Sequence, residues 1–484
     1  MTKSRLGAAL AAAMISVAPA HAVTLNPRGL GQVLLYPYYT INKQQATLIS
    51  VVNTSDIGKM INVRFNEGYN GRPALAFNVF LSPHDVWAAA ISESSNGGAI
   101  LRTTDRTCTD VTIPEEGLAF QTSAFDGSAP GFPADSGPHD IARTREGSIE
   151  IVAAGDIVPG SLTDAAVTHV QTGNPGEGTP SDCASITAAQ LAIDVVAPTA
   201  ALSGSGSIVN VSEGTFFGYV ADAITGFSDT PLVDEALDTT RGSLLDLANT
   251  SEAAPAIRAH VLPSDRAAID VDYADSIDAV SAVLMMDSIS NEYLLDASIG
   301  AATDWIVTFP TKRFYVDKLL YPNGATEPFA APFESGRSGV RIDSRLSYDR
   351  EEGTTIIAFC GVPPPTGCFP YPSDLNWETT AVNFGSHIVT TTTSAVLGSA
   401  LVVSLAAFGT SGWFEMDLTA YENHVLASGS LATDGTPLTL TGLPVNGFMV
   451  YNVININAQP GRLANYSGLF AHRGHVACVG AACN

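Results

Sequence analysis

"MINVRFNEGYNGRPALAFNVFLSP", residues 60–83, is the stretch that decides the fold. In its first half, apolar side chains alternate with Asn62 and Arg64, and the "AFNVFL" run repeats this period of two. Such alternation is typical of a strand with one buried and one solvated face. Asn70-Gly71 lies between the two runs and tolerates positive φ at both turn positions. The stretch therefore predicts a β-hairpin of half-buried strands.

Similar runs recur along the chain. They include "ATLISVVNTS" (46–55), "GSIEIVAAG" (147–155) and "SGSIVNVSEGTFFGYVADAI" (205–224). Strands that recur about every dozen residues, with turn residues between them, favour an immunoglobulin-like sandwich. Further on, "WIVTF" and "GWFEMDLTA" echo "TLISV" and "GSIEIVAAG", which indicates a weak internal repeat. The predicted fold is mostly β: two immunoglobulin-like β-sandwich units with long loop insertions, held by disulfides.

The predicted organisation has three parts. Residues 1–22 form a signal peptide, 23–300 an N-terminal β-sandwich unit, and 301–484 a C-terminal β-sandwich unit. Within the N-terminal unit, 101–204 is rich in Gly, Pro and Asp and reads as a loop-rich insertion. Inside it, "ASITAAQLAI" (184–193) predicts a short helix. Long loops on a rigid β scaffold commonly carry binding function, so this insertion is the first candidate for a contact surface.

The first 22 residues have the features of a bacterial secretory signal. Lys3 and Arg5 precede a short apolar run, and Ala20-His21-Ala22 is a small-x-small cleavage pattern. The alternative, a membrane anchor, is disfavoured because the apolar run is too short to span a bilayer. We therefore expect an exported protein, in the periplasm, on the outer surface or secreted, with no transmembrane span after signal removal.

All six cysteines lie in the exported part of the chain. An even number of cysteines in an oxidising compartment predicts disulfides, and six allow fifteen pairings. Closeness in sequence favours Cys360 with Cys368 and Cys478 with Cys483. Cys108 and Cys183 then remain as the third pair.

The charge of the chain bears on its partners. Removing Lys3 and Arg5 from the 23 Lys and Arg leaves 21 basic against 48 acidic side chains, so the exported chain carries about −27. This excess of negative charge argues against a nucleic-acid partner or an anionic membrane surface. The 45% of hydrophobic residues is enough for a sizeable core, so a globular chain is expected.

Two clusters resemble metal sites. His472, His475, Cys478 and Cys483, in "FAHRGHVACVGAACN", could form a tetrahedral zinc site. The alternative is a disulfide between the two cysteines, which is favoured because Gly474 separates the histidines without helical periodicity and the compartment is oxidising.

The second cluster is acidic. Asp270, Asp272, Asp275 and Asp278 offer carboxylates at a density that suits calcium. The segment lacks the glycine and the terminal glutamate of an EF-hand, so a solvated acidic loop is the favoured interpretation. Apart from possible calcium, no cofactor is predicted.

Catalytic signals are weak. The chain has no G-x-S-x-G elbow, and a Ser, His and Asp set cannot be recognised without geometry. The aromatic residues of "LYPYY" (35–39), with Trp87 and Trp305, could stack on carbohydrate but are expected in the core. The exported chain has only four lysines, which commonly guard strand edges, so open edges could accept a strand such as "VTLNPRGLGQ" (23–32) from a neighbour.

The runs "LLYPYYT", "TLISVVNTS", "VRFNEG", "FNVFLSPHDVW" and "TDWIVTFPTKRFYV" resemble a family of uncharacterised exported proteins of Gram-negative bacteria. The resemblance covers most of the exported chain and implies export, but it implies no activity and no site residue. The leading hypothesis is a cell-surface or secreted structural or binding protein without enzymatic activity, whose partner is a second copy or another surface protein. The alternative is a secreted hydrolase with its site in the loops of 101–204.

Overall fold

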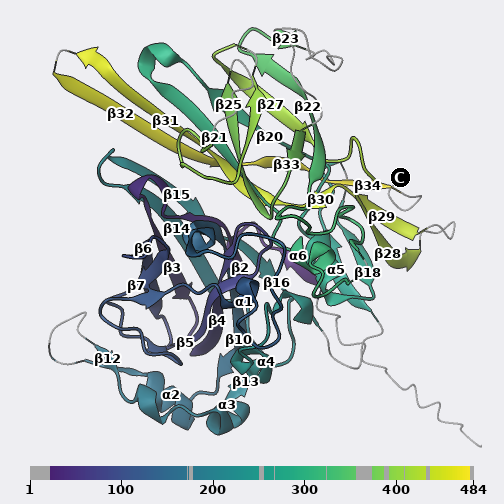
Figure 1. The fold of residues 1–484 in the computed structure, drawn as a ribbon. Coiled ribbons are helices and arrows are strands. Elements are labelled where there is room, and N and C mark those ends of the chain that lie inside the picture. The colour runs from purple at the N-terminus through teal and green to yellow at the C-terminus, as the bar shows by residue number, and fades with distance from the viewer. Residues whose placement is uncertain are drawn as a thin grey trace, which may run out of the picture.

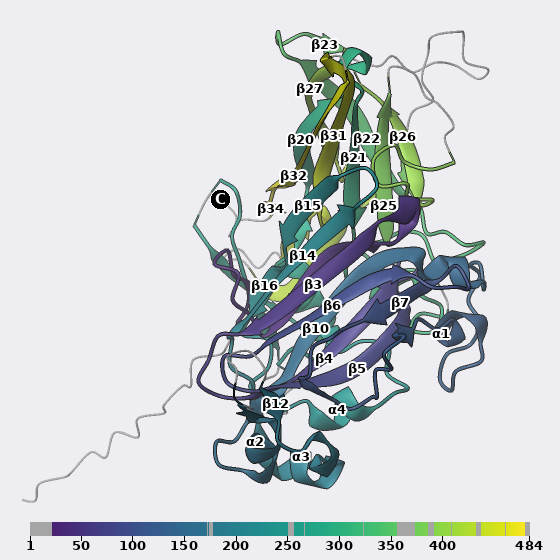
Figure 2. The same ribbon diagram turned by 90° about the vertical axis from the view of Figure 1, so that its left-hand side faces the viewer.

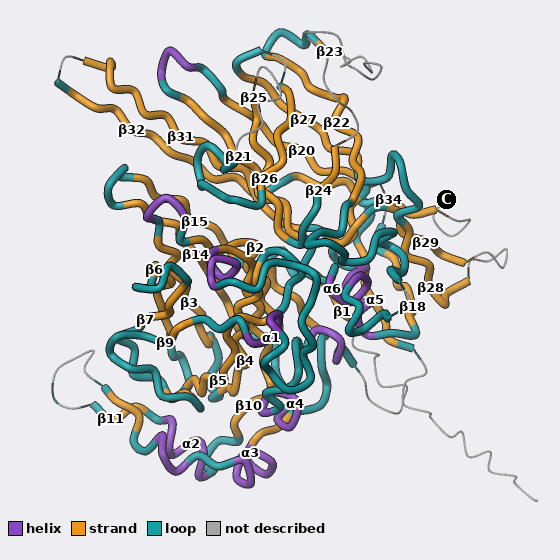
Figure 3. The backbone as a smooth tube through the Cα atoms, in the orientation of Figure 1, coloured by secondary structure: helices purple, strands orange, loops and turns teal. Residues whose placement is uncertain are grey.

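The computed structural model has a mostly β architecture, as the sequence predicts. It describes residues 22–479 except 172, 174–177, 250–255, 266, 323, 356–372, 386–391, 408, 432–436 and 460. The predicted signal peptide, apart from Ala22, lies outside the described residues. Helices are short and few among these residues, and long loops run between the sheets (Figure 3).

Two large sheets form the N-terminal half (Figure 1). Sheet A consists, in spatial order, of β18 (Ile269–Tyr273), β17 (Ile257–Val261), β1 (Val23–Leu25), β16 (Asp222–Thr225), β2 (Val33–Thr40), β10 (Glu146–Ile157), β4 (Lys59–Glu67), β5 (Pro73–Leu81) and β8 (Cys108–Thr109), with β13 (Val195–Val196) paired to β10. Sheet B consists of β15 (Thr215–Val220), β14 (Leu202–Asn210), β3 (Ala46–Asn53), β6 (Val86–Glu93), β7 (Ala99–Arg102) and β9 (Leu118–Ala119). Sheet B lies across sheet A and faces the viewer in Figure 2.

Two further sheets form the C-terminal half. Sheet C consists of β23 (Thr354–Thr355), β22 (Val340–Asp349), β27 (Ser411–Asp417), β20 (Ser288–Leu294) and β33 (Arg473–His475), with β24 (Ser373–Leu375) paired to β22. Sheet D consists of β26 (Val402–Ala406), β25 (Thr379–Gly385), β21 (Ala301–Thr308), β31 (Asn446–Gln459) and β32 (Arg462–Ala471). Strand β20 belongs to sheet C although it precedes residue 300, and the predicted boundary at 300 stays a prediction.

Small elements complete the described fold. Three pairings are minor: β11 (His169–Val170) with β12 (Thr179–Pro180), β19 (Met285–Met286) with β30 (Leu443–Pro444), and the sheet of β28 (Val425–Leu431), β29 (Pro437–Thr441) and β34 (Ala477–Val479). The α-helices are α1 (Ser123–Asp126), α2 (Leu162–Val167), α3 (Ala188–Asp194), α4 (Val233–Leu237), α5 (Ser276–Ala282) and α6 (Arg313–Val316). Helix α3 confirms the helix predicted within 184–193. It begins with a capping box, in which Thr187 and Gln190 satisfy each other's backbone N–H groups.

The predicted hairpin is present, but its strands are not half-buried. β4 pairs with β5, and Gly71 adopts φ +67° in the turn between them. Every residue of β4 is buried, including Asn62 and Arg64. Their face of sheet A is covered by the segments 110–132 and 236–241, whose backbone carbonyls at Ala236 and Arg241 accept hydrogen bonds from these side chains. Alternation predicted the pairing correctly and the solvent exposure wrongly, because polar residues of β4 face covering loops.

The aromatic residues of "LYPYY" lie in the core, as expected. Tyr36, Tyr38 and Tyr39 are at most 1% exposed, and so are Trp87 and Trp305. This core extends from the N-terminal half into the C-terminal half. Phe448 of sheet D lies 6.4 Å from Tyr38 and 5.3 Å from Tyr219, between ring centroids. Sheet D therefore packs one face against the N-terminal half and the other against sheet C.

Strand β1, which directly follows the predicted signal peptide, is paired within sheet A. Strand β1 runs antiparallel to β16 and parallel to β17. The idea that this segment is a free strand for a neighbouring molecule was therefore wrong, because its backbone groups already have partners on both sides. Assembly through other strand edges stays a prediction.

One of the predicted disulfides lies among the described residues. Cys108 on β8 is bonded to Cys183, 75 positions later, with the Cα atoms 5.3 Å apart. This confirms the pairing of Cys108 with Cys183. Cys478 lies on β34 opposite Leu440. Cys360, Cys368 and Cys483 lie outside the described residues, so the other two pairings stay predictions.

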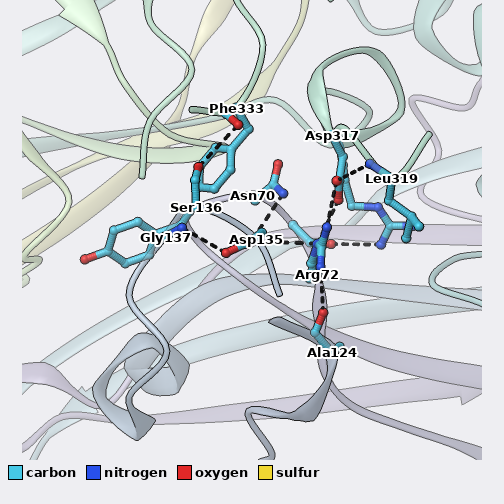
Figure 4. Close-up of polar contacts among 12 residues, drawn as sticks. Asn70, Arg72, Ala124, Asp135, Ser136, Gly137, Asp317, Leu319 and Phe333 are labelled. Carbon is cyan, nitrogen blue, oxygen red and sulfur yellow. Dashed lines mark hydrogen bonds and ion pairs between the residues drawn. The ribbon is translucent and has the colours of Figure 1, made fainter. Parts of the chain in front are cut away.

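A buried cluster of ion pairs joins the two halves (Figure 4). Arg72, directly after the hairpin turn, donates two hydrogen bonds of 2.8 Å to the carboxylate of Asp317, and its Nε lies 3.7 Å from Asp135. Arg143 donates to Glu67 and to Asp135 with distances of 2.6–2.9 Å. The cluster fixes the loop at 135, inside the predicted insertion, between the hairpin and the C-terminal half.

Candidate functional site

The two tail histidines make separate contacts. His472 Nε2 donates to the carbonyl of Ile306 at 2.9 Å, and its Nδ1 lies 3.2 Å from Asn291 Nδ2. Burial lowers the pKa of His472 to about 4, so its ring is neutral at ordinary pH. His475 contacts Asp287 at 2.8 Å. Both histidines therefore already have partners in the described structure, and the zinc hypothesis, which also needs Cys483, stays a prediction.

The acidic cluster is divided between two elements. Asp270 and Asp272, on β18, contact His260 and Arg258 on the neighbouring strand, each at 2.7 Å. The described residues contain no group of three or more His, Cys, Asp or Glu arranged to hold a metal ion. Calcium binding at this segment stays a prediction.

The other two aspartates of the cluster lie at helix α5. Asp275 occupies the N-cap position without a side-chain cap hydrogen bond. Asp278 accepts a hydrogen bond of 2.7 Å from the hydroxyl of Tyr315. Burial raises the pKa of Asp278 to about 6, and the charge of Asp275 adds to the rise.

We expect Asp278→Asn to stabilise the protein above pH 6. Because the folded pKa is raised from 3.8 to about 6, the stability that this group contributes is present below pH 3.8 and lost as pH rises through 6. The asparagine keeps an acceptor for Tyr315 and carries no charge. After allowance for partial solvent screening, the gain at pH 7.5 is about 1–2 kcal/mol.

Urea denaturation at pH 4 and pH 7.5 measures this difference. Asp270→Asn, at the exposed end of the same cluster, is the matched control and should change stability by less than about 1 kcal/mol. A gain from Asp278→Asn that is equal at both pH values contradicts the prediction. Adding calcium to the wild type in the same assay tests the calcium hypothesis, which requires a rise in stability.

A groove of about 990 Å³ lies in the C-terminal half. It lies where β20, β22 and β27 of sheet C meet the β31–β32 hairpin of sheet D (Figure 1). We call it the aromatic groove. Its lining consists of Ser290, Asn291, Glu292, Tyr293, Leu294, Tyr348, Asp349, Arg350, Glu352, Ser411, Gly412, Trp413, Met449, Tyr451, Phe470 and Arg473.

Two stacked aromatic pairs give the groove its name. Tyr348 and Trp413 are cross-strand neighbours, with ring centroids 4.3 Å apart and planes 7° apart. Tyr451 and Phe470, from the opposite sheet, lie 6.3 Å apart with planes 11° apart. Trp413 is 39% exposed and Phe470 50% exposed. The groove therefore presents flat, accessible aromatic rings from both sheets.

The edges of the groove are charged. Glu292 and Arg473 lie 3.9 Å apart, and both side chains are mostly exposed. Asp349, Arg350 and Glu352 add charges at the end of β22. Three carboxylates and two guanidinium groups therefore surround the aromatic rings, so hydrogen-bond donors and acceptors are both present and the excess of negative charge is small.

The part of β20 beyond its pairing with β33 offers no free edge to another strand. The hydroxyl of Thr303 bonds both the N–H and the carbonyl of Leu294 at 2.9 Å. The indole N–H of Trp305 donates to the carbonyl of Glu292 at 3.0 Å. Side chains of sheet D thus satisfy backbone groups that an exposed edge would offer to another strand. The groove is suited to side-chain recognition of a ligand.

Sequence reasoning missed this groove. The prediction placed binding function in the loops of 101–204, whereas the groove is built by strands beyond residue 287. A signal was available in "GWFEMD", where Trp413 and Phe414 are adjacent and must face opposite sides of a strand. Phe414 is buried and Trp413 faces the groove. The sequence of this strand does not show which strand pairs with it, so Tyr348 could not be predicted as the stacking partner of Trp413.

Comparisons with protein-family models, with curated proteins and with solved structures find no match to this chain. The described part of the chain contains no helix with the length and apolarity needed to cross a lipid bilayer. The class of protein must therefore be argued from the groove.

Proposed function

We propose that the protein is an exported, non-enzymatic binding protein that holds a neutral glycan chain in the aromatic groove. The observation that supports this is the pair of flat aromatic platforms, Tyr348 with Trp413 and Tyr451 with Phe470, in one open groove. The faces of sugar rings carry C–H groups that pack on aromatic rings, while their hydroxyl groups need donors and acceptors at the rim. Glu292, Arg473 and Asp349 supply these.

The proposals of export, of immunoglobulin-like units and of a family resemblance rest mainly on the sequence. The signal-like start and the even number of cysteines support export to the periplasm, the outer surface or the medium, and the disulfide between Cys108 and Cys183 fits an oxidising compartment. The immunoglobulin-like character of the two units and the resemblance to exported Gram-negative proteins also remain part of the proposal. A glycan ligand is consistent with a cell-surface or secreted protein.

The test is direct binding of neutral oligosaccharides. Cellohexaose, chitohexaose and maltohexaose are titrated into the purified exported chain by calorimetry, and tryptophan fluorescence is followed. Trp413 is well exposed while Trp87 and Trp305 are buried, so a ligand in the groove should change the Trp413 emission. Failure of all neutral glycans to bind contradicts the proposal. Release of shorter sugars, followed by chromatography, would instead favour the alternative of a secreted hydrolase.

We expect Trp413→Ala to weaken glycan binding by about 10- to 100-fold, because loss of one stacking platform costs roughly 1.4–2.8 kcal/mol. Tyr466→Ala is the matched control: Tyr466 is 64% exposed on β32 but does not line the groove. The control should bind with wild-type affinity. Equal affinity of Trp413→Ala and the wild type would place the ligand outside the groove.

A further inference from the structure

A second hollow lies in the N-terminal half, over the polar face of the β4–β5 hairpin. It has a volume of about 240 Å³, is partly open to solvent, and is bordered by the segments 110–132 and 236–241. We call it the Arg64 cavity. It borders the predicted insertion of 101–204 and shares no lining residue with the aromatic groove.

Arg64 forms the floor of this cavity and is only 2% exposed. Its Nε donates to Asn62 Oδ1 at 2.7 Å, and its Nη1 donates to the carbonyl of Arg241 at 2.5 Å. The described residues give Arg64 no ion pair, and its Nη2 is not one of the buried polar atoms that lack a partner, so Nη2 is open to the cavity. A ligand with an anionic group could therefore replace water at this buried cation.

The nearest carboxylate by strand register does not neutralise Arg64. Glu150 lies directly opposite Arg64 on β10. Its two oxygens accept hydrogen bonds from the hydroxyl of Ser243 at 2.7 Å and from the N–H of Leu244 at 3.0 Å. Glu150 is therefore held toward the 243–244 segment, and its attraction for Arg64 acts from beyond ion-pair distance.

Two further arginines increase the positive charge. Arg241 lines the cavity and is paired with Asp246 at 2.7 Å. Arg313 donates to the backbone carbonyls of Gly71 and Gly242. Burial lowers the pKa of Arg64 to about 10, and the charges of Arg313 and Arg241 contribute to the fall, while Glu150 opposes it. The lining carries two arginines, Arg64 and Arg241, and two aspartates, Asp110 and Asp238, and Arg241 already has Asp246 as its partner.

The remaining walls limit the ligand. Phe132, Leu237 and the small side chains of Ala76 and Ala124 line the cavity, so most of a ligand would contact apolar groups. Asp110 and Asp238 lie at the lining as well, and Asp110 is already bound by the N–H and the side-chain amide of Asn78 at 2.7 Å. These two carboxylates oppose a ligand with two or more negative charges. At about 30 Å³ per water-sized group, the cavity holds roughly eight non-hydrogen atoms.

We propose that the Arg64 cavity binds a small monocarboxylate with an apolar tail, whose carboxylate accepts a hydrogen bond from Nη2 of Arg64. The carboxylate supplies the anion that Arg64 lacks at ion-pair distance, and the tail packs against Phe132 and Leu237. This inference rests on the buried arginine and its surroundings, independently of the aromatic groove, and assigns the protein a second ligand.

The experiment titrates the full exported chain with sodium benzoate and sodium hexanoate at pH 7, followed by calorimetry and by the shift of the melting temperature. Benzyl alcohol, hexanol and inorganic sulfate are the matched probes. Binding of the carboxylates at least ten times tighter than that of the two alcohols and of sulfate supports the proposal. If benzyl alcohol and hexanol bind as tightly as the carboxylates, Arg64 does not recognise the ligand. If sulfate binds more tightly than the carboxylates, the ligand of this cavity is not a monocarboxylate.

Two variants locate the site. Arg64→Met should weaken benzoate binding at least 30-fold, and Arg258→Met, on the surface strand β17, should leave it unchanged. Because loss of Arg64 also removes hydrogen bonds inside the fold, Ala129→Phe provides a second variant that fills the cavity from its loop wall and leaves Arg64 in place. Benzoate affinity that is unchanged in Ala129→Phe overturns the proposal, whether or not Arg64→Met folds.

Discussion

Replacing Arg143 with methionine should lower the free energy of unfolding by about 3–5 kcal/mol, the cost of leaving buried carboxylates without their partner. The side chains of Arg143 and Glu67 are fully buried, and Asp135 is nearly so. Arg143 donates two hydrogen bonds to each carboxylate. Its guanidinium also lies 4.4 Å from the ring centroid of Phe125. Methionine keeps much of the volume and removes all of these contacts.

The loss should depend on pH. Burial alone would raise the pKa of Asp135, but hydrogen bonds and charge from Arg143 hold this pKa below its usual value. A carboxylate with a depressed folded pKa contributes stability that is present above its unfolded pKa, near 3.8, and is lost as pH falls through the folded pKa. The difference between wild type and Arg143→Met should therefore be full at pH 7 and shrink below about pH 4.

Urea denaturation followed by circular dichroism measures both effects. Arg341→Met is the matched control, because Arg341 and Asp374 form an ion pair of 3.1 Å with both side chains exposed. It should cost less than about 1 kcal/mol. Similar losses for Arg143→Met and Arg341→Met would show that the buried cluster contributes no more than a surface pair.

The β4–β5 hairpin shows how far the sequence could predict the fold. Asn70-Gly71 and the alternation around it predicted the β4–β5 hairpin correctly. The polar members of that alternation, Asn62 and Arg64, were expected in water and are buried. Alternation reports that two faces differ in polarity, and it carries no information on which distant segment covers the polar face. The covering carbonyls at Ala236 and Arg241 lie more than 170 positions away.

The candidate site was less predictable than the fold, for a related reason. His472 and His475 are three residues apart in sequence, yet they contact Ile306 and Asp287, which belong to other elements. The rings of the aromatic groove are the reverse case: Tyr348 and Trp413 are far apart in sequence and stacked in space. The spacing of residues in sequence can predict a site on one helix or one turn. It cannot predict a site built by several strands, because that site depends on the order of the strands in the sheet.

The last prediction concerns the disulfide between Cys108 and Cys183. Replacing both Cys108 and Cys183 with serine should lower the free energy of unfolding by about 4 kcal/mol, because the unfolded chain regains the entropy of a 75-residue loop. Cys108 lies on β8, which pairs with β5, and Asp110 follows it in the wall of the Arg64 cavity. Loss of the bridge frees this wall, so any small-carboxylate affinity should fall along with stability.

The single variants Cys108→Ser and Cys183→Ser are the controls for this effect. Each breaks the same bridge, so each should lose nearly as much stability as the double variant when unfolding is measured by urea denaturation. Chemical reduction is unsuitable, because it acts on the other cysteines as well. If each single variant loses about half of the free energy of unfolding that the double variant loses, the two side chains contribute independently and the disulfide itself contributes no stability. If all three losses are equal, they belong to the closed loop, and the cross-link is what holds the segment around residue 183 to β8 of sheet A.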